Sequence, residues 1–110
     1  MKKFLVCAFG MLCAAGSCFA ANYTADRHVA RGVKCEMCHV KADKSIPIRQ
    51  QQCLVCHGPN YAAMAQKTKT VKPNPHYNHY GDRDCSTCHK GHEASVLTCN
   101  TCHQFDMKTP

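Results

Sequence analysis

The sequence has few of the large apolar side chains that form a protein core. From Ala21 onward, Leu, Ile, Val and Phe number 11 of 90 residues, below the roughly 20% expected of a chain that folds unaided. No segment alternates apolar and polar residues for long enough to predict a sheet. We therefore expect the polypeptide to be largely disordered unless another group supplies buried apolar surface. These residues are Val29, Val33, Val40, Ile46, Ile48, Leu54, Val55, Val71, Val96, Leu97 and Phe105.

The motifs of several common enzyme classes are also missing. The six glycines are scattered without a G-x-G-x-x-G pattern, so this chain encodes no strand-turn-helix unit for a flavin or a nicotinamide. No nucleophile and base stand apart from the cysteines and histidines that are assigned below. We predict no catalytic residue.

The first twenty residues have the pattern of an export signal. Lys2 and Lys3 give a positive start, residues 4–15 are apolar, and small residues up to Ala20 follow, which predicts cleavage after Ala20 and a periplasmic location. One alternative is an uncleaved anchor, although a spanning helix needs about 20 apolar residues; another is a lipoprotein modified at Cys18. We expect a signal peptide at 1–20, one domain at 21–110 and no stable membrane insertion.

Cysteine, in contrast, is abundant, with 11 residues. Three lie in the first twenty residues, and the other eight form four C-x-x-C pairs, each followed at once by histidine. Two cysteines at this spacing can form thioethers to one porphyrin while the imidazole reaches its iron, so each motif predicts one haem c. Zinc ribbons share the C-x-x-C pair without requiring the histidine. The cysteines predicted to attach four haems are Cys35, Cys38, Cys53, Cys56, Cys85, Cys88, Cys99 and Cys102.

The eight histidines divide equally between motif and non-motif positions. One additional histidine per haem is what bis-histidine iron requires, and two imidazoles leave electron exchange as the main reaction. A methionine ligand from Met37, Met64 or Met107 is the alternative. The predicted axial ligands are the motif residues His39, His57, His89 and His103 and the non-motif residues His28, His76, His79 and His92.

Spacing along the chain predicts which histidines share an iron. Three non-motif histidines lie ten or eleven residues before a motif histidine, and a loop of that length reaches around a porphyrin edge. Elimination then assigns the fourth, although an exchange of His76 with His79 stays open. The expected pairs are His28 with His39, His76 with His57, His79 with His89 and His92 with His103.

The formal charge of +7 does not predict a nucleic-acid partner. Lys2 and Lys3 leave with the signal peptide, and the eight propionates of four haems would bring the charge to about −3.

The predicted fold is small and mostly coil, with a few short α-helices wrapped around four covalently bound haems. We expect a helical turn at 28–31, an extended loop around 46–48 within the connection at 40–52, a helix at 61–67 and an irregular segment at 71–75.

Four features occur in a characteristic order: a histidine before the first motif, H-Y-N-H at 76–79, C-S-T-C-H-K-G-H-E at 85–93 and C-N-T-C-H-Q-F-D at 99–106. This order resembles the haem domain of periplasmic flavocytochrome c fumarate reductases and the related small tetrahaem cytochromes. The resemblance implies closely spaced bis-histidine haems with the pairs given above. Two departures are the short separation of Cys35 from Cys53, 18 residues, and the end at Pro110, where the flavoenzymes continue into a flavin domain.

We therefore expect a periplasmic electron-transfer protein that is not itself an enzyme. Its donor would be a membrane quinol-oxidising cytochrome. Its acceptor would be a terminal reductase, either a separate flavoprotein subunit resembling fumarate reductase or another periplasmic reductase reached by a free shuttle. The alternatives are a multihaem reductase with one open haem iron, a membrane-bound quinol dehydrogenase and a haem store.

Overall fold

Short helices and long loops make up the computed structural model, which describes residues 22–110. The predicted signal peptide at 1–20 lies outside the described residues. No strand occurs between residues 22 and 110, and the predicted mostly coil fold is confirmed. The α-helices are α1 (Thr24–Val29), α2 (Cys35–Cys38), α3 (Gln50–His57) and α4 (Tyr61–Lys67), and the 3-10 helices are η1 (Val40–Ala42), η2 (Cys85–Thr87) and η3 (Thr98–Thr101).

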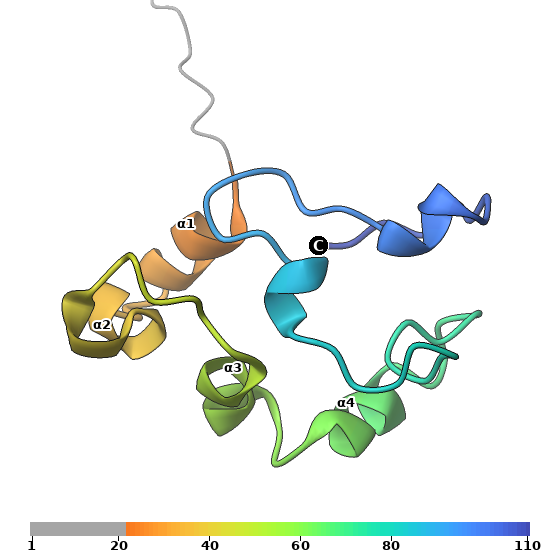
Figure 1. The fold of residues 1–110 in the computed structure, drawn as a ribbon, viewed down its shortest axis with the longest axis horizontal. Coiled ribbons are helices and arrows are strands. Elements are labelled where there is room, and N and C mark those ends of the chain that lie inside the picture. Colours follow the sequence, from red (N-terminus) through yellow and green to blue (C-terminus); the bar gives the residue numbers. More distant parts are fainter. Residues whose placement is uncertain (1–21) are drawn as a thin grey trace, which may run out of the picture.

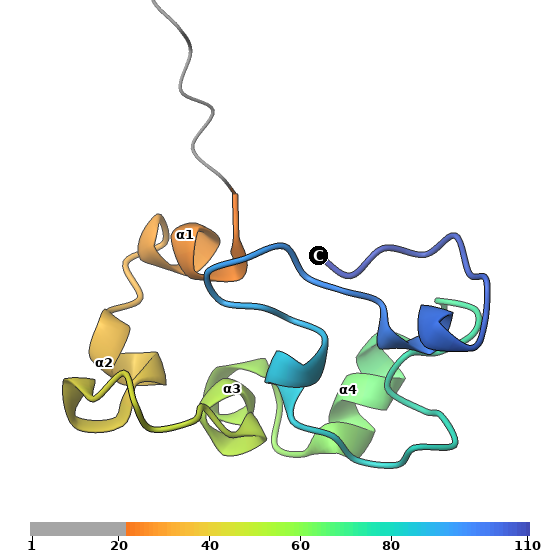
Figure 2. The same cartoon turned by 45° about the horizontal axis from the view of Figure 1, so that its top comes forward.

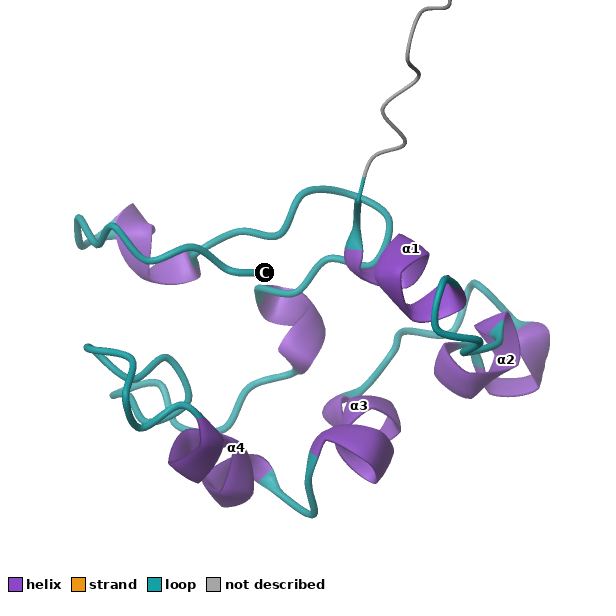
Figure 3. Cartoon of the chain, turned by 180° about the vertical axis from the view of Figure 1, so that it is seen from behind, coloured by secondary structure: helices purple, strands orange, loops and turns teal. Residues whose placement is uncertain are grey.

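The chain follows an open, ring-like course (Figure 1). Helices α1 to α4 succeed one another around it, and the segment after η2 returns towards α1 (Figure 2). There the Ala25 main-chain N–H donates a hydrogen bond to the Gly91 oxygen at 2.8 Å. The view from behind shows that loops carry most of the path (Figure 3). Along the described part of the chain, no helix has the length and apolar character needed to cross a membrane.

Protein side chains alone bury very little. Within residues 22–110, Tyr61 and Ala65 are the buried hydrophobic residues, each 8% exposed. Large apolar side chains elsewhere lie open, including Val55 at 84% and Val29 at 58%. Apolar groups gain free energy when they leave water, so this fold has the apolar surface to cover a large partner group.

The predicted helix at 61–67 is confirmed as α4. It begins after Asn60, whose side-chain oxygen accepts a hydrogen bond from the Ala63 N–H at 2.9 Å. This contact satisfies one of the N–H groups that have no partner within the helix. The predicted turn at 28–31 is replaced by α1, which starts earlier, where the Asp26 carboxylate accepts from the Tyr23 N–H at 3.0 Å.

The extended loop predicted around 46–48 lies between η1 and α3, where the structure has neither helix nor strand. Asp84 fixes the beginning of α3 although it lies far along the chain. Its carboxylate accepts from the Gln50 N–H at 2.9 Å and from the Arg49 guanidinium at 3.0 Å. Both bonds hold the pKa of Asp84 below its usual value, and the bond from Gln50 has the larger effect. Because Asp84 directly precedes the third motif, these bonds connect the helix of the second motif to the third motif.

Candidate functional site

Each C-x-x-C-H motif coils into a helical turn, in α2, α3, η2 and η3. In three of them the histidine N–H donates to the carbonyl oxygen of the first cysteine of the same motif, at 2.8 to 2.9 Å. Residues at positions i, i+3 and i+4 lie on one face of a helix. The turn therefore presents both cysteines and the histidine to the same side, as attachment to one haem requires. These helical turns were not among the helices expected from the sequence, although the motif spacing is the signal that indicates them.

The second and third motifs meet at their first cysteines. The interaction between the Cys53 and Cys85 side chains lowers the pKa of Cys85 to about 7 and raises that of Cys53. All eight motif cysteines are free thiols rather than disulfides. Two haems attached here would have neighbouring edges.

The histidine rings form four separate pairs, and each pair joins one motif histidine to one non-motif histidine. The ring planes are nearly parallel in two pairs, at 5° and 7°, and cross at 54° and 66° in the others. The ring centres are 5.8 Å apart for His28 and His57, 6.2 Å for His39 and His92, 6.3 Å for His76 and His89, and 6.3 Å for His79 and His103.

These separations fit two imidazoles on opposite sides of one metal ion. A metal–imidazole bond is about 2 Å long and the ring centre lies roughly 1.2 Å behind the nitrogen, so two such rings should be about 6.3 Å apart. Each pair supplies two nitrogen donors, which is the set that occupies the two axial positions of haem iron. Residues 22–110 contain no cluster of three or more His, Cys, Asp or Glu side chains suited to a bare metal ion.

The structure brings together different partners from those expected from spacing. None of the four expected pairs occurs among the ring pairs of the described residues. The main-chain bond between Ala25 and Gly91 carries His92 to the first motif rather than the fourth. Loop length sets only an upper limit on reach, whereas contacts between distant segments decide which rings lie side by side.

Hydrogen bonds at Nδ1 orient several of these imidazoles. His28 Nδ1 lies 2.6 Å from the Thr24 carbonyl oxygen, and His89 Nδ1 lies 3.3 Å from the Pro110 oxygen. A carbonyl can only accept, so Nδ1 carries the proton in both rings and Nε2 keeps a lone pair for a metal. Nδ1 of His39 differs, because it is buried without a partner in the described part of the protein.

The four pairs differ in exposure. His76 and His89 are both half-buried. Burial lowers the pKa of each, and for His76 the charge of His89 lowers it further. Both imidazoles are therefore neutral near pH 7, as metal ligands must be.

His79 and His103 are both exposed and have aromatic neighbours. The Phe105 ring lies 4.8 Å from the His103 ring at an angle of 13°, and the Tyr80 ring lies 4.6 Å from the His79 ring. The Arg83 guanidinium sits 4.4 Å from the centre of the Tyr80 ring. These neighbours limit the rotation of both imidazoles.

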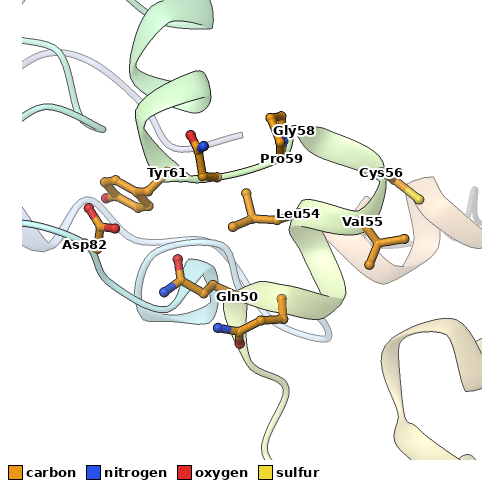
Figure 4. A pocket seen from close by; sticks show the side chains of 10 residues that line it. Gln50, Leu54, Val55, Cys56, Gly58, Pro59, Tyr61 and Asp82 are labelled. Atoms are coloured by element: carbon orange, nitrogen blue, oxygen red, sulfur yellow. The ribbon is translucent and has the colours of Figure 1, made fainter.

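A separate open pocket of about 650 Å³ lies between α3 and the start of α4 (Figure 4). Leu54, Tyr61, Gln50 and Asp82 line it, while Cys56 points away from Leu54 (Figure 4). No histidine contributes to its wall. None of the four histidine pairs therefore lies in this pocket.

Comparison with known proteins identifies the family of this chain. The family model of Cytochrome c3 matches residues 27–104. The chain is 36% identical over 110 residues, 96% of its length and 18% of the relative's, to the probable fumarate reductase Ifc3 of Shewanella frigidimarina (strain NCIMB 400). It is 40% identical over 48 residues, 44% of its length and 22% of the relative's, to the cytochrome c-type protein Cgr1 of Eggerthella lenta.

The chain spans about a fifth of the length of these curated relatives. No solved structure matches it. The family match encloses all four C-x-x-C-H motifs and all eight histidines. The chain therefore belongs to the cytochrome c3 family of multihaem c-type cytochromes, whose domain is an electron carrier.

Proposed function

We propose that this chain carries electrons through four haem c groups, each held by two thioethers and two axial histidines. The observation that carries this proposal is the division of eight histidines into four pairs with similar ring separations, each pair containing one motif histidine. The proposed axial pairs are His28 and His57, His39 and His92, His76 and His89, and His79 and His103, and the proposed thioether ligands are the eight motif cysteines.

Two imidazoles close both faces of an iron, so substrates have no coordination position and electron exchange remains. When bound, haem supplies a one-electron ferric/ferrous couple. The helical turns fix each motif histidine, and the hydrogen bonds at Nδ1 fix the rings of His28 and His89. Ligands held in this way keep their positions in both oxidation states, which favours rapid electron transfer.

The proposed site of action is the periplasm, with a membrane quinol-oxidising cytochrome as donor and a flavoprotein reductase as acceptor. Support for the acceptor comes from the relative named a probable fumarate reductase, which aligns with 96% of this chain. Co-purification tests it: a flavoprotein should accompany the chain under gentle conditions. Recovery of the chain alone would instead favour a free shuttle.

Haem pairing can be tested by combining a ligand variant with haem removal. His92→Ala should open one ferric iron and produce a high-spin signal in electron paramagnetic resonance (EPR). Adding Cys35→Ala and Cys38→Ala removes the first haem and should abolish that signal, because His92 faces His39 in the first motif. The same cysteine changes beside an intact His92 are the control.

Persistence of the high-spin signal in that combined variant would contradict the pairing of His92 with His39. Disappearance of the signal only when the cysteines of the fourth motif are removed would favour the spacing-based pair instead. A high-spin signal in the unaltered ferric protein would support the alternative function, a multihaem reductase with one open iron.

A further inference from the structure

Thr68, the residue that follows α4, lies beside the half-buried ring of His76. Its hydroxyl oxygen is 3.0 Å from His76 Nδ1, 2.7 Å from Asn74 Oδ1 and 2.9 Å from the Met64 carbonyl oxygen. A hydroxyl has one proton to donate and two lone pairs that accept. The neighbours of this hydroxyl therefore determine whether it donates to His76 or accepts from it.

Asn74 settles the direction of these bonds. Its Oδ1 accepts from the His76 main-chain N–H at 3.0 Å, and its Nδ2 donates to the Ala65 carbonyl at 2.8 Å. Two main-chain groups thus fix which end of the amide is oxygen. Asn74 Oδ1 and the Met64 carbonyl are both acceptors, so the Thr68 proton points to them rather than to His76, and Asn74 Oδ1 is the nearer of the two, at 2.7 Å against 2.9 Å. The Thr68 oxygen is then left to accept a hydrogen bond from His76 Nδ1–H.

The pair formed by His76 and His89 is distinctive for its hydrogen bonds. His76 donates from Nδ1 to Thr68, and His89 has the Pro110 oxygen at 3.3 Å from its own Nδ1. Both rings therefore have an acceptor behind them. An acceptor at Nδ1 makes an imidazole more basic at Nε2, and a more basic ligand stabilises ferric over ferrous iron.

We propose that Thr68 is a positioning residue that fixes the tautomer of His76 and lowers the reduction potential of the haem attached by the third motif. This inference rests on the proposed function, in which His76 and His89 ligate that iron. Thr68 acts through His76. It provides a side-chain control of one haem potential that is independent of the other three.

Thr68→Val tests the proposal, because valine keeps the shape of threonine without the hydroxyl. The ferric-to-ferrous ratio of one haem at a fixed potential should fall by about threefold to tenfold, the size of one lost hydrogen bond. This change equals a rise of roughly 28 to 59 mV for a one-electron couple. A potentiometric titration of the holoprotein monitored by EPR should show one shifted transition, among the haems with nearly parallel imidazoles.

Three variants complete the test. Thr68→Ser should restore the original potential, Thr68→Ala should reproduce the shift if the valine variant assembles poorly, and Thr70→Val is the matched control at an exposed threonine. The proposal is overturned if no transition moves, if all four move together, or if serine behaves like valine. Failure of the underlying function would look different, since the unaltered protein would then lack four low-spin haems.

Discussion

Asn74→Ala would remove three hydrogen bonds that hold the loop between α4 and His76. The amide accepts from the Thr68 hydroxyl at 2.7 Å and the His76 N–H at 3.0 Å, and donates to the Ala65 carbonyl at 2.8 Å. Each bond contributes a net stabilisation of about 0.5–1.5 kcal/mol, so the free energy of unfolding should fall by roughly 3 kcal/mol. The side chain is half-buried, so water replaces these bonds only in part.

Urea unfolding of the ferric holoprotein, followed by circular dichroism of the haem bands, measures this change. At about 1–3 kcal/mol per molar urea, a loss of roughly 3 kcal/mol lowers the midpoint by about 1–3 M. Gln66→Ala is the matched control, because this exposed amide on α4 makes no side-chain hydrogen bond within the described residues. A midpoint for Asn74→Ala no lower than that of the control would refute the reasoning.

Three other changes have defined outcomes. The pKa of Asp84 is lowered in the folded protein, so its stabilising bonds are complete above the unfolded value of about 3.9 and are lost as pH falls through the lower folded value. Asp84→Asn should therefore weaken the fold at neutral pH and lose less stability on acidification. Denaturation midpoints that fall in parallel for both proteins as the pH is lowered would contradict this. Phe105→Leu should alter an EPR signal from a crossed imidazole pair, because Phe105 stacks on His103, and a change confined to the parallel class would count against this contact. Haem-free protein should lack cooperative unfolding by circular dichroism, because residues 22–110 bury so little apolar surface, and a cooperative transition would show that the haems are not the missing core.

The fold class was predictable because composition and motif density constrain it. Few apolar residues and four C-x-x-C-H motifs indicate a coil-rich chain built around cofactors. Local signals located α4, since Asn60 caps a run of helix-forming residues. The beginning of α3 was harder to find in this way, because Gln52 accepts locally from the Arg49 N–H but the first helical N–H is satisfied by the distant Asp84. A bond between residues so far apart leaves no local trace in the sequence.

The candidate ligands follow from residue identity, whereas the ring partners that the structure brings together do not follow from spacing. The equal division of histidines between motif and non-motif positions depends on residue identity alone. Which imidazole faces which depends on contacts such as Ala25 with Gly91 and Arg83 with Thr98, whose side chains are 3.1 Å apart. Such contacts draw non-motif histidines towards motifs that spacing does not indicate.

EPR of the fully oxidised holoprotein, with the spins counted against the protein concentration, tests the central claim most directly. Parallel imidazoles separate the energies of two iron d orbitals, whereas crossed imidazoles leave them nearly equal and give a more anisotropic signal. We predict four low-spin ferric haems per chain, two of each kind, to match ring angles of 5° and 7° and of 54° and 66°. A high-spin ferric signal, or fewer than four low-spin haems, would contradict an electron carrier with two histidines on every iron.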